Sequence, residues 1–479
     1  MINSCKLIVP YELHAEIMRH LFPGDGDEHG LVILAGVANV DGCLRLLARE
    51  VVYALDGVDY VQGRHSHRSL RAAFIQPLIK KCREQKLAYI AVHNHGGTNR
   101  VSFSYTDLHS HEQGYPGLLE LSGGMPVGAA VYAKRAVAGD IWLPDGRRLE
   151  LNETRIIGSN IVRLTDCPHD HTFGDHDRDT YDRQIRMFGE KGQQILRNSV
   201  VGVIGAGGVG SLAIEQLARL GVGKLVVADP DRIETSNLSR VVGATRWDAK
   251  HPFTSTAWPA WVRNIAQQFA TKKCAITERV ARAANPSIKF ESYSADFAKD
   301  DIARKFLQCD FLILAADSMR ARLVFNAMVH QYFIPGIQIG SKIVAEEDDD
   351  MTDAFSVIRW VRPGSNCLWC TGMISSHQLA IEAKSEIEKA DQAYGTESPS
   401  PSVITMNAIG AAQGCNDALF SLLALHDREG LSISRRFKHP SRRMIEEVLH
   451  RDDECPECGV NLMSRMGKGD AMPLPTLVG

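Results

Sequence analysis

Between residues 181 and 345, short apolar runs alternate with segments of helical periodicity. Strands are expected at 200–204, 224–228, 289–292 and 311–315, and helices at about 209–220 and 272–284. Buried parallel strands form continuous apolar runs, and their alternation with helices is typical of a doubly wound sheet. The pattern therefore predicts an α/β fold with a parallel sheet for this part of the chain.

The pattern differs on either side of this region. Residues 1–160 mix short apolar runs with helical patches, which predicts a separate α+β domain. Residues 161–180 are crowded with Asp, His, Gly and Pro, which predicts a linker. We expect the second domain to extend over residues 181–460, with a long helix beginning near Met406, and residues 461–479 to form a flexible tail.

The composition favours a cytoplasmic protein. The 479-residue chain has a formal net charge of −3, which predicts neither nucleic-acid nor membrane binding. No run reaches the roughly 18 apolar residues needed to span a bilayer, and the first residues lack the layout of a signal peptide. Four of the eleven cysteines form two Cys-x-x-Cys pairs, which favours metal binding in a reducing compartment over disulfides.

A glycine-rich turn follows the strand expected at 200–204. It reads Gly-Ala-Gly-Gly-Val-Gly and contains Gly205, Gly207, Gly208 and Gly210. Glycines at the start of a helix let phosphate groups approach backbone N–H groups, so the turn predicts a nucleotide site in a Rossmann-like fold. Asp229, at the end of the next strand, is placed to accept ribose hydroxyl groups. On its own, this turn would suggest a dinucleotide.

The residues around the turn indicate ATP instead. The run from Asp231 to Arg240 reads Asp-Arg-Ile-Glu-Thr-Ser-Asn-Leu-Ser-Arg, and Tyr181-Asp-Arg-Gln-Ile precedes the turn. These motifs resemble those of the ThiF/MoeB-type adenylating enzymes, which are related to ubiquitin-activating enzymes. The resemblance implies ATP and Mg²⁺ as cofactors, a homodimer, and a ubiquitin-like protein or peptide with a C-terminal glycine as partner.

The resemblance also implies roles for six residues. Asp229 would hold the ribose, Asn237, Arg240 and Lys273 would clamp the phosphates, Asp317 would bind Mg²⁺, and Arg183 would reach the γ-phosphate of ATP in the partner subunit. Lys273 is chosen for its distance from Asn285-Pro286, and Lys272 is the alternative. Attack of a carboxylate on an α-phosphate brings two anions together, so a cluster of cations fits this chemistry.

The sequence departs from this family between Arg240 and Lys273. About thirty residues lie there, including Trp247, Trp258 and Trp261, and they predict a helical insertion near the active site. The run from Leu314 to Asp317 is also less polar than the family pattern.

The two cysteine pairs predict a structural zinc site. Cys367 and Cys370 form one pair and Cys455 and Cys458 the other, and four thiolates in two such pairs are typical of a closed tetrahedral Zn²⁺ site. A redox pair is the alternative. Cys415 lies between the pairs, inside an expected helix, where we interpret it as a small buried residue. The expected crossover at residues 397–407 contains no cysteine, so the sequence supports adenylation but not an enzyme thioester.

A second metal site is expected in the first domain. His93-Asn-His95 follows an expected strand, and Ser104-Tyr-Thr-Asp107 comes next; two imidazoles and a carboxylate leave one zinc position open for water. The pattern resembles the JAB/JAMM metalloproteases. It implies zinc bound by His93, His95 and Asp107, Glu28 as general base and Ser104 as oxyanion stabiliser, with Glu50 the alternative base. The gap from His95 to Asp107 is one residue longer than usual, and non-ligating histidines in a loop are the alternative.

Both halves can act on one substrate. The metalloprotease would trim a ubiquitin-like precursor or cleave a conjugate, and the adenylation domain would activate the exposed carboxylate. In the alternative interpretation, the first domain serves only in recognition, and the second adenylates a small peptide or sulfur carrier without an enzyme thioester.

Overall fold

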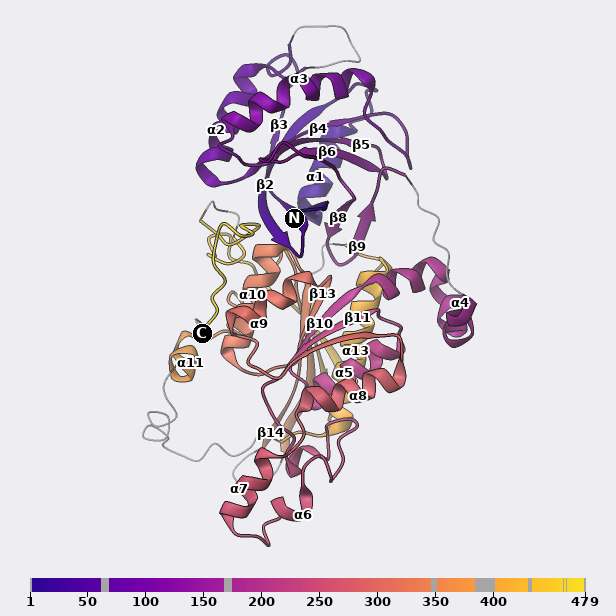
Figure 1. Cartoon of the computed structure of the whole chain (residues 1–479), viewed down its shortest axis with the longest axis vertical. Coiled ribbons are helices and arrows are strands. Elements are labelled where there is room, and N and C mark those ends of the chain that lie inside the picture. The colour runs from indigo at the N-terminus through magenta and orange to yellow at the C-terminus, as the bar shows by residue number, and fades with distance from the viewer. Residues whose placement is uncertain are drawn as a thin grey trace.

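The computed structural model describes residues 2–61, 69–167, 175–345, 351–383, 401–429, 433–459, 461 and 463–477. Two mixed sheets dominate these ranges, one in each half of the chain (Figure 1). None of the helices in the described ranges is long and apolar enough to cross a membrane.

The N-terminal domain is built on a nine-stranded sheet in the order β7-β6-β5-β4-β2-β3-β1-β8-β9. Its strands are β1 Ser4–Pro10, β2 Gly30–Val40, β3 Cys43–Tyr53, β4 Ala88–Asn94, β5 Val127–Tyr132, β6 Val137–Trp142, β7 Arg148–Glu150, β8 Glu153–Ile157 and β9 Ile161–Leu164. Its helices are α1 Tyr11–Leu21, α2 Ala72–Gln85 and α3 Tyr105–Leu121. The α+β pattern predicted for this part is therefore observed. Because β9 pairs with β8, the sheet continues beyond residue 160, and residues 161–164 are not part of a linker.

The second sheet has the order β12-β11-β10-β13-β14-β15-β16-β17. Its strands are β10 Val200–Ile204, β11 Lys224–Ala228, β12 Lys289–Tyr293, β13 Phe311–Leu314, β14 Gly336–Ala345, β15 Met351–Val361, β16 Ile433–Lys438 and β17 Arg443–Val448. The strands from β12 to β14 are parallel, which confirms the predicted parallel sheet. The strands from β14 to β17 extend it in antiparallel fashion.

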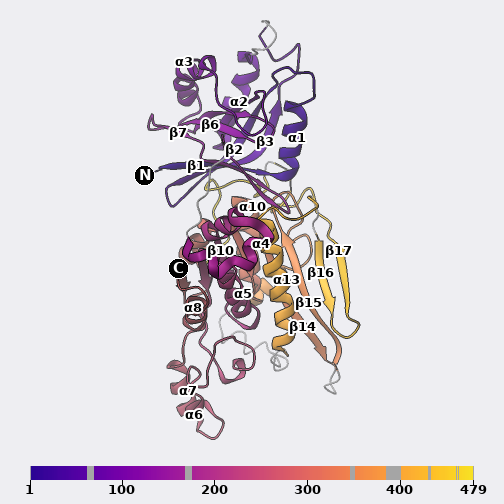
Figure 2. The same cartoon turned by 90° about the vertical axis from the view of Figure 1, so that its right-hand side faces the viewer.

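Helices cover this second sheet (Figure 2). The helices of this half of the chain are α4 Asp175–Asn198, α5 Gly208–Arg219, α6 His251–Thr254, α7 Ala260–Gln268, α8 Lys273–Ala284, α9 Asp300–Lys305, α10 Met319–Tyr332, α11 Ser376–Glu382 and α13 Ile404–Leu422, with 3-10 turns at Thr235–Asn237 and Phe306–Gln308. Of these, α6 and α7 project away from the sheet (Figure 1). The side chains of Val201, Val203, Leu225 and Ile313 are completely buried. The parallel strands thus form the centre of the core, and the loops after them are free to build a site.

The C-terminal segment 463–477 packs between the two domains, although residues 461–479 were expected to be a flexible tail. Gly469 bridges to Val37 of β2, and Leu477 bridges to Lys299. A Cβ atom on Gly36 would lie 1.8 Å from the carbonyl oxygen of Gly467, so the two backbones are in direct contact. Backbone pairing and close packing hold this segment, which its Gly- and Pro-containing sequence did not indicate.

Candidate active sites

The glycine-rich turn lies where β10 ends and α5 begins. Gly205 has a φ of +95°, a conformation that side chains disfavour. A Cβ atom on Gly210 would lie 1.9 Å from the carbonyl oxygen of Gly205, whereas nothing lies within 4 Å of a Cβ placed on Gly207. Gly210 therefore allows the helix to pack against the turn, and Gly207 leaves open space above it.

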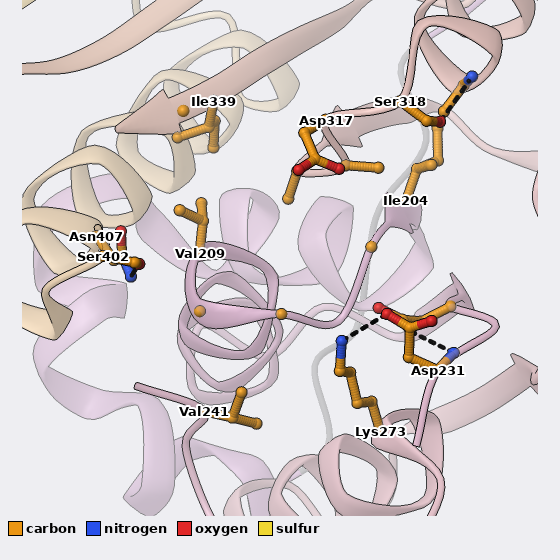
Figure 3. A pocket seen from close by; sticks show the side chains of 18 of the residues that line it. Ile204, Val209, Asp231, Val241, Lys273, Asp317, Ser318, Ile339, Ser402 and Asn407 are labelled. Atoms are coloured by element: carbon orange, nitrogen blue, oxygen red, sulfur yellow. Dashed lines mark hydrogen bonds and ion pairs between the residues drawn. The ribbon is translucent and has the colours of Figure 1, made fainter. Parts of the chain in front are cut away.

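A pocket of about 520 Å³ opens over this turn (Figure 3). Seven of the predicted nucleotide-site residues line this pocket, and they come from several separate segments of the chain: Gly205, Gly207, Gly208, Asp229, Asn237, Arg240 and Lys273. Asp317, the predicted magnesium ligand, also lines it, but Gly210 does not. The N-terminus of α5 points its unpaired N–H groups at this space, which favours an anionic group there.

Asp229 has both carboxylate oxygens engaged by the backbone. Its Oδ2 accepts from the N–H of Ala206 at 2.7 Å, and its Oδ1 accepts from the N–H of Asp231 at 2.9 Å. Burial raises the pKa of Asp229, and the nearby Lys273 opposes this shift. These hydrogen bonds fix the carboxylate at the floor of the pocket, where it can accept further hydrogen bonds from a ligand.

The structure separates the two rival lysines. The Lys273 ammonium lies 2.7 Å from Asp231 Oδ2 in the pocket (Figure 3). The Lys272 ammonium donates to the carbonyl oxygen of Pro230 at 3.0 Å, and Lys272 is not among the residues that line the pocket. Lys273 is therefore the better placed of the two to meet a phosphate.

The 3-10 turn Thr235–Asn237 positions the other phosphate-binding candidates. Asn237 is buried, and its side chain accepts from the N–H of Glu234 at 3.3 Å. Arg240 donates to the carbonyl oxygen of Ser236 at 3.0 Å. Both side chains line the pocket, so the turn places an amide and a guanidinium beside the glycine-rich turn.

Asp317 and Ser318 lie after the parallel strand β13. The Ser318 hydroxyl caps α10 by accepting from the N–H of Ala321 at 3.2 Å. Asp317 faces the same pocket as Lys273 from the opposite side (Figure 3). A carboxylate beside a triphosphate is the ligand type that Mg²⁺ prefers, so the residue fits the predicted magnesium role.

Sequence reasoning missed a polar wall contributed by β14 and α13. Gln338, Ser341 and Asn407 line the pocket, the Ser341 hydroxyl donates to Asn407, and Asn407 donates to Ser402 at 3.1 Å. These residues carry no local motif. Their only signal is that polar side chains interrupt otherwise apolar segments.

Arg183 lies outside the pocket of its own chain. It belongs to α4, and 95% of its side chain is exposed. Its predicted role with the ATP of a partner subunit stays a prediction.

Four cysteines converge as the paired motifs predict. The sulfur atoms of Cys367 and Cys455 lie 3.8 Å apart, and those of Cys370 and Cys458 lie 3.5 Å apart. A tetrahedral zinc ion with Zn–S bonds of 2.3 Å would separate its sulfur ligands by about 3.8 Å. The cluster therefore fits zinc. Cys415, which lies between the two pairs in the sequence, is buried as expected. Burial raises the pKa of its thiol to about 12.

His93 on β4, His95 just after that strand and Asp107 in the first turn of α3 form a second cluster. The two Nε2 atoms lie 3.1 Å apart, and Asp107 Oδ2 lies 3.6 Å from His93 and 3.5 Å from His95. His95 also contacts the carbonyl oxygen of Ser102 through Nδ1 at 3.0 Å. A proton on Nδ1 leaves the Nε2 lone pair available to a metal, so the cluster fits a zinc ion.

The structure also separates the two candidate bases. Glu28 Oε1 lies 3.8 Å from His95 Nε2, whereas both oxygens of Glu50 accept from the Lys81 ammonium at 2.7 Å. Glu28 and two members of the cluster line one pocket of about 210 Å³. Ser104 caps α3 and donates to Asp107 Oδ2 at 2.7 Å, so in this structure its hydroxyl orients a ligand candidate.

A family model matches part of the second domain. Residues 181–371 match the ThiF family. The SAMP-activating enzyme E1 of Haloferax volcanii is 33% identical over 159 residues, which are 33% of this chain and 52% of that protein. The sulfur carrier protein adenylyltransferase of Thermus thermophilus is 28% identical over 150 residues, 31% of this chain and 48% of that protein. The chain thus spans about half the length of these curated relatives.

A solved structure gives a weaker likeness. The crystal structure of E. coli MccB with ATP has 18% sequence identity and a TM-score of 0.42, over 60% of this chain and 76% of that chain. Most residues that line the glycine-rich pocket lie within the matched range, and Asn407 lies beyond it. Residues 181–371 of this chain therefore form a ThiF-family domain.

Proposed function

We propose that the chain uses ATP to adenylate the C-terminal carboxylate of a ubiquitin-like protein, sulfur carrier or peptide that ends in glycine. The observation that carries this proposal is that Arg240, Lys273 and Asp317 line the same pocket as the glycine-rich turn. Two cations and one carboxylate suit a triphosphate with its magnesium ion. The relatives named as activating enzymes and adenylyltransferases support the same chemistry.

The reaction forms an acyl-adenylate. A carboxylate oxygen attacks the α-phosphorus of ATP, and the bond from that phosphorus to the bridging oxygen breaks to release pyrophosphate. Arg240, Lys273 and the N-terminus of α5 offset the charge that gathers on the phosphates. Asp317 would hold Mg²⁺, which supplies further charge neutralisation.

The proposed reaction does not pass through an enzyme thioester. A thioester needs an accessible thiolate. Cys415 is buried, and its raised pKa keeps the thiol protonated near neutral pH.

We further propose that the N-terminal domain is a zinc-dependent peptidase that exposes the carboxylate. His93, His95 and Asp107 would hold the metal, which supplies a water of lowered pKa. Glu28 lines the same pocket, 3.8 Å from His95, and would take a proton from a bound water. Recognition without hydrolysis remains the second candidate function for this domain. Hydrolysis would be supported if wild-type protein cleaved a carrier precursor and the Glu28→Gln variant bound the precursor without cleaving it.

Pyrophosphate exchange tests the adenylation. Wild-type protein with ATP and a glycine-ended carrier should exchange labelled pyrophosphate into ATP, and Asp317→Ala should abolish this exchange. Asp301→Ala is the control, because Asp301 is exposed on α9 outside the pocket. Exchange that survives Asp317→Ala would contradict the role of Asp317, and the absence of exchange in the wild type with every carrier would contradict the function.

Mixing variants tests the proposed homodimer. If Arg183 acts on the ATP of the partner subunit, Arg183→Ala and Asp317→Ala should each be inactive alone. A mixed dimer then contains one site with both residues intact, so co-refolded or co-expressed variants should regain exchange. Inactivity of the mixture, with dimers demonstrated by sedimentation, would contradict a role for Arg183 across the interface.

A further inference from the structure

The insertion between Arg240 and Lys273 carries an exposed apolar stripe. Trp261, Ile265 and Phe269 recur at intervals of four residues from α7 into the residue after it, so they lie on one face. Their exposed fractions are 67%, 49% and 69%. A neighbouring face of α7 packs inward through Ala266, which is buried. Large exposed apolar groups gathered on one face are typical of a binding surface.

The same insertion carries three more exposed aromatic residues. Phe253 and Trp258 are both exposed, and their ring centroids lie 6.1 Å apart. Trp247 is exposed as well, with the Lys250 ammonium 4.8 Å from its ring centroid. We call these three residues and the α7 stripe the aromatic surface. Trp and Phe dominate the binding energy of many protein interfaces.

The aromatic surface is positively charged. Residues 246–272 contain Arg246, Lys250, Arg263 and Lys272 but one carboxylate, Asp248. That carboxylate is buried and accepts from the Arg279 guanidinium at 2.8 Å. A second copy of this surface would bring like charges together. The surface therefore complements a partner face that combines apolar and acidic residues.

The insertion is continuous with the nucleotide pocket. Its two ends are anchored by Val241 and Lys273, and both residues line that pocket. α6 and α7 project from the second domain on the side away from the N-terminal domain (Figure 1). A partner seated on α7 is therefore close to the pocket in which its C-terminus would react.

We infer that the aromatic surface docks the folded body of the carrier protein whose C-terminal glycine is adenylated, through an acidic and apolar face of that carrier. This inference rests on the proposed function, because it names the partner of that site. The surface contributes to binding of the whole carrier and not to binding of ATP or of the carrier's tail alone. An apolar stripe that includes Ile265 fits a protein partner better than a nucleic acid, whose bases stack on aromatic rings and whose phosphates need cations.

The experiment compares two probes. They are a ubiquitin-like carrier that ends in glycine and a synthetic peptide with the sequence of that carrier's C-terminal tail. Pyrophosphate exchange gives the KM for each probe and for ATP, and fluorescence anisotropy of the labelled carrier gives its Kd without ATP. The test variant is Trp261→Ser with Ile265→Ser and Phe269→Ser. The control is Leu121→Ser, which removes an exposed apolar residue from α3.

The triple variant should raise the KM and the Kd for the whole carrier about tenfold or more. The KM for ATP and for the tail peptide should stay within about twofold, and Leu121→Ser should behave as wild type. Charge reversal in Arg246→Glu with Lys250→Glu should also weaken carrier binding, more strongly at low salt. Circular dichroism would check that each variant is folded, and every changed position except the half-buried Lys250 is exposed.

Other outcomes separate the docking surface from the adenylation. Exchange in the wild type, with an unchanged carrier KM and Kd in the triple variant, would overturn the docking surface while adenylation stands. If the wild type showed no exchange with either probe but bound the carrier, and the triple variant lost this binding, adenylation would be overturned and the docking surface retained. Two further outcomes would overturn the inference if the triple variant kept its carrier affinity. If the triple variant no longer formed the dimers that the wild type forms, the surface would be assigned to a second copy of the chain. If it no longer bound a labelled single-stranded RNA that the wild type binds, the surface would be assigned to RNA.

Discussion

Arg155 and Asp310 form a buried ion pair that joins the two domains. The guanidinium of Arg155, on β8 of the first sheet, donates to Asp310 just before β13 of the second sheet. Asp310 also accepts from the N–H of Val200 at 2.9 Å. The two domains are therefore joined by a largely buried charged contact, in addition to the linker.

Removal of one partner of this pair should destabilise the protein strongly. Arg155→Met leaves the Asp310 carboxylate buried without its main cation, a change that typically costs about 3–5 kcal/mol. The free energy of unfolding from chemical denaturation would measure this cost. Arg147→Met is the matched control, because Arg147 and Asp145 form an exposed pair and its loss should cost less than about 1 kcal/mol. Equal losses in the two variants would show that the buried pair has no special role.

The same pair predicts a pH dependence in acid. Burial alone would raise the pKa of Asp310, but the Arg155 and Arg163 guanidinium groups lower it to about 2, from an ordinary value of 3.8. Because the pKa is lower in the folded state, the stabilisation is complete above about pH 4 and is lost as the pH falls towards 2. One pKa unit corresponds to about 1.4 kcal/mol, so the loss is about 2 kcal/mol.

Asp310→Asn isolates this contribution. The free energy of unfolding, measured between pH 2 and pH 5, should fall less steeply in the variant than in the wild type. Parallel curves for the two proteins would contradict the lowered pKa of Asp310.

The two ligand clusters should differ in their effect on stability. We expect about two zinc ions per chain by elemental analysis, one for each cluster. Cys458→Ser should lose about one zinc ion and lower the Tm, because this site ties Cys455–Cys458 to Cys367–Cys370. His95→Ala should lose the other ion with a small change in Tm. Cys43→Ser, which changes a cysteine outside both clusters, should retain both ions.

The parallel core of the second domain was predictable because its strands carry local signals. The strands β10, β11 and β13 are apolar runs, and the turn from Gly205 to Gly210 marks where the first of them ends. Strands β16 and β17 are short and mix charged and apolar residues without a regular pattern. The pairing of β16 with β15 also depends on residues far apart in the sequence. The sequence therefore did not indicate the antiparallel half of the sheet.

The site was predictable where a motif surrounds a residue or lies at a known distance from it. Asp229, Asn237 and Arg240 belong to one continuous run, and the structure brings them to one pocket. Gln338 and Asn407 reach the same pocket from β14 and α13, and only the fold places them there. The packing of the C-terminal segment against β2 was missed for the same reason, since its contacts connect residues hundreds of positions apart.

The two neighbouring lysines give a sharp test of the pocket. Lys273→Met removes an ammonium group that lines the pocket 2.7 Å from Asp231. We expect it to lower kcat/KM for pyrophosphate exchange about 100-fold or more, because the lost cation opposes phosphate charge in the transition state. Lys272→Met removes the same charge one residue away, where the ammonium is bonded to the carbonyl oxygen of Pro230 outside the pocket. Its kcat/KM should stay within about threefold of wild type. If Lys272→Met lowered kcat/KM as much as Lys273→Met does, the effect of both variants would be a general electrostatic one. If Lys272→Met lowered kcat/KM more than Lys273→Met, the phosphate contact would be assigned to Lys272.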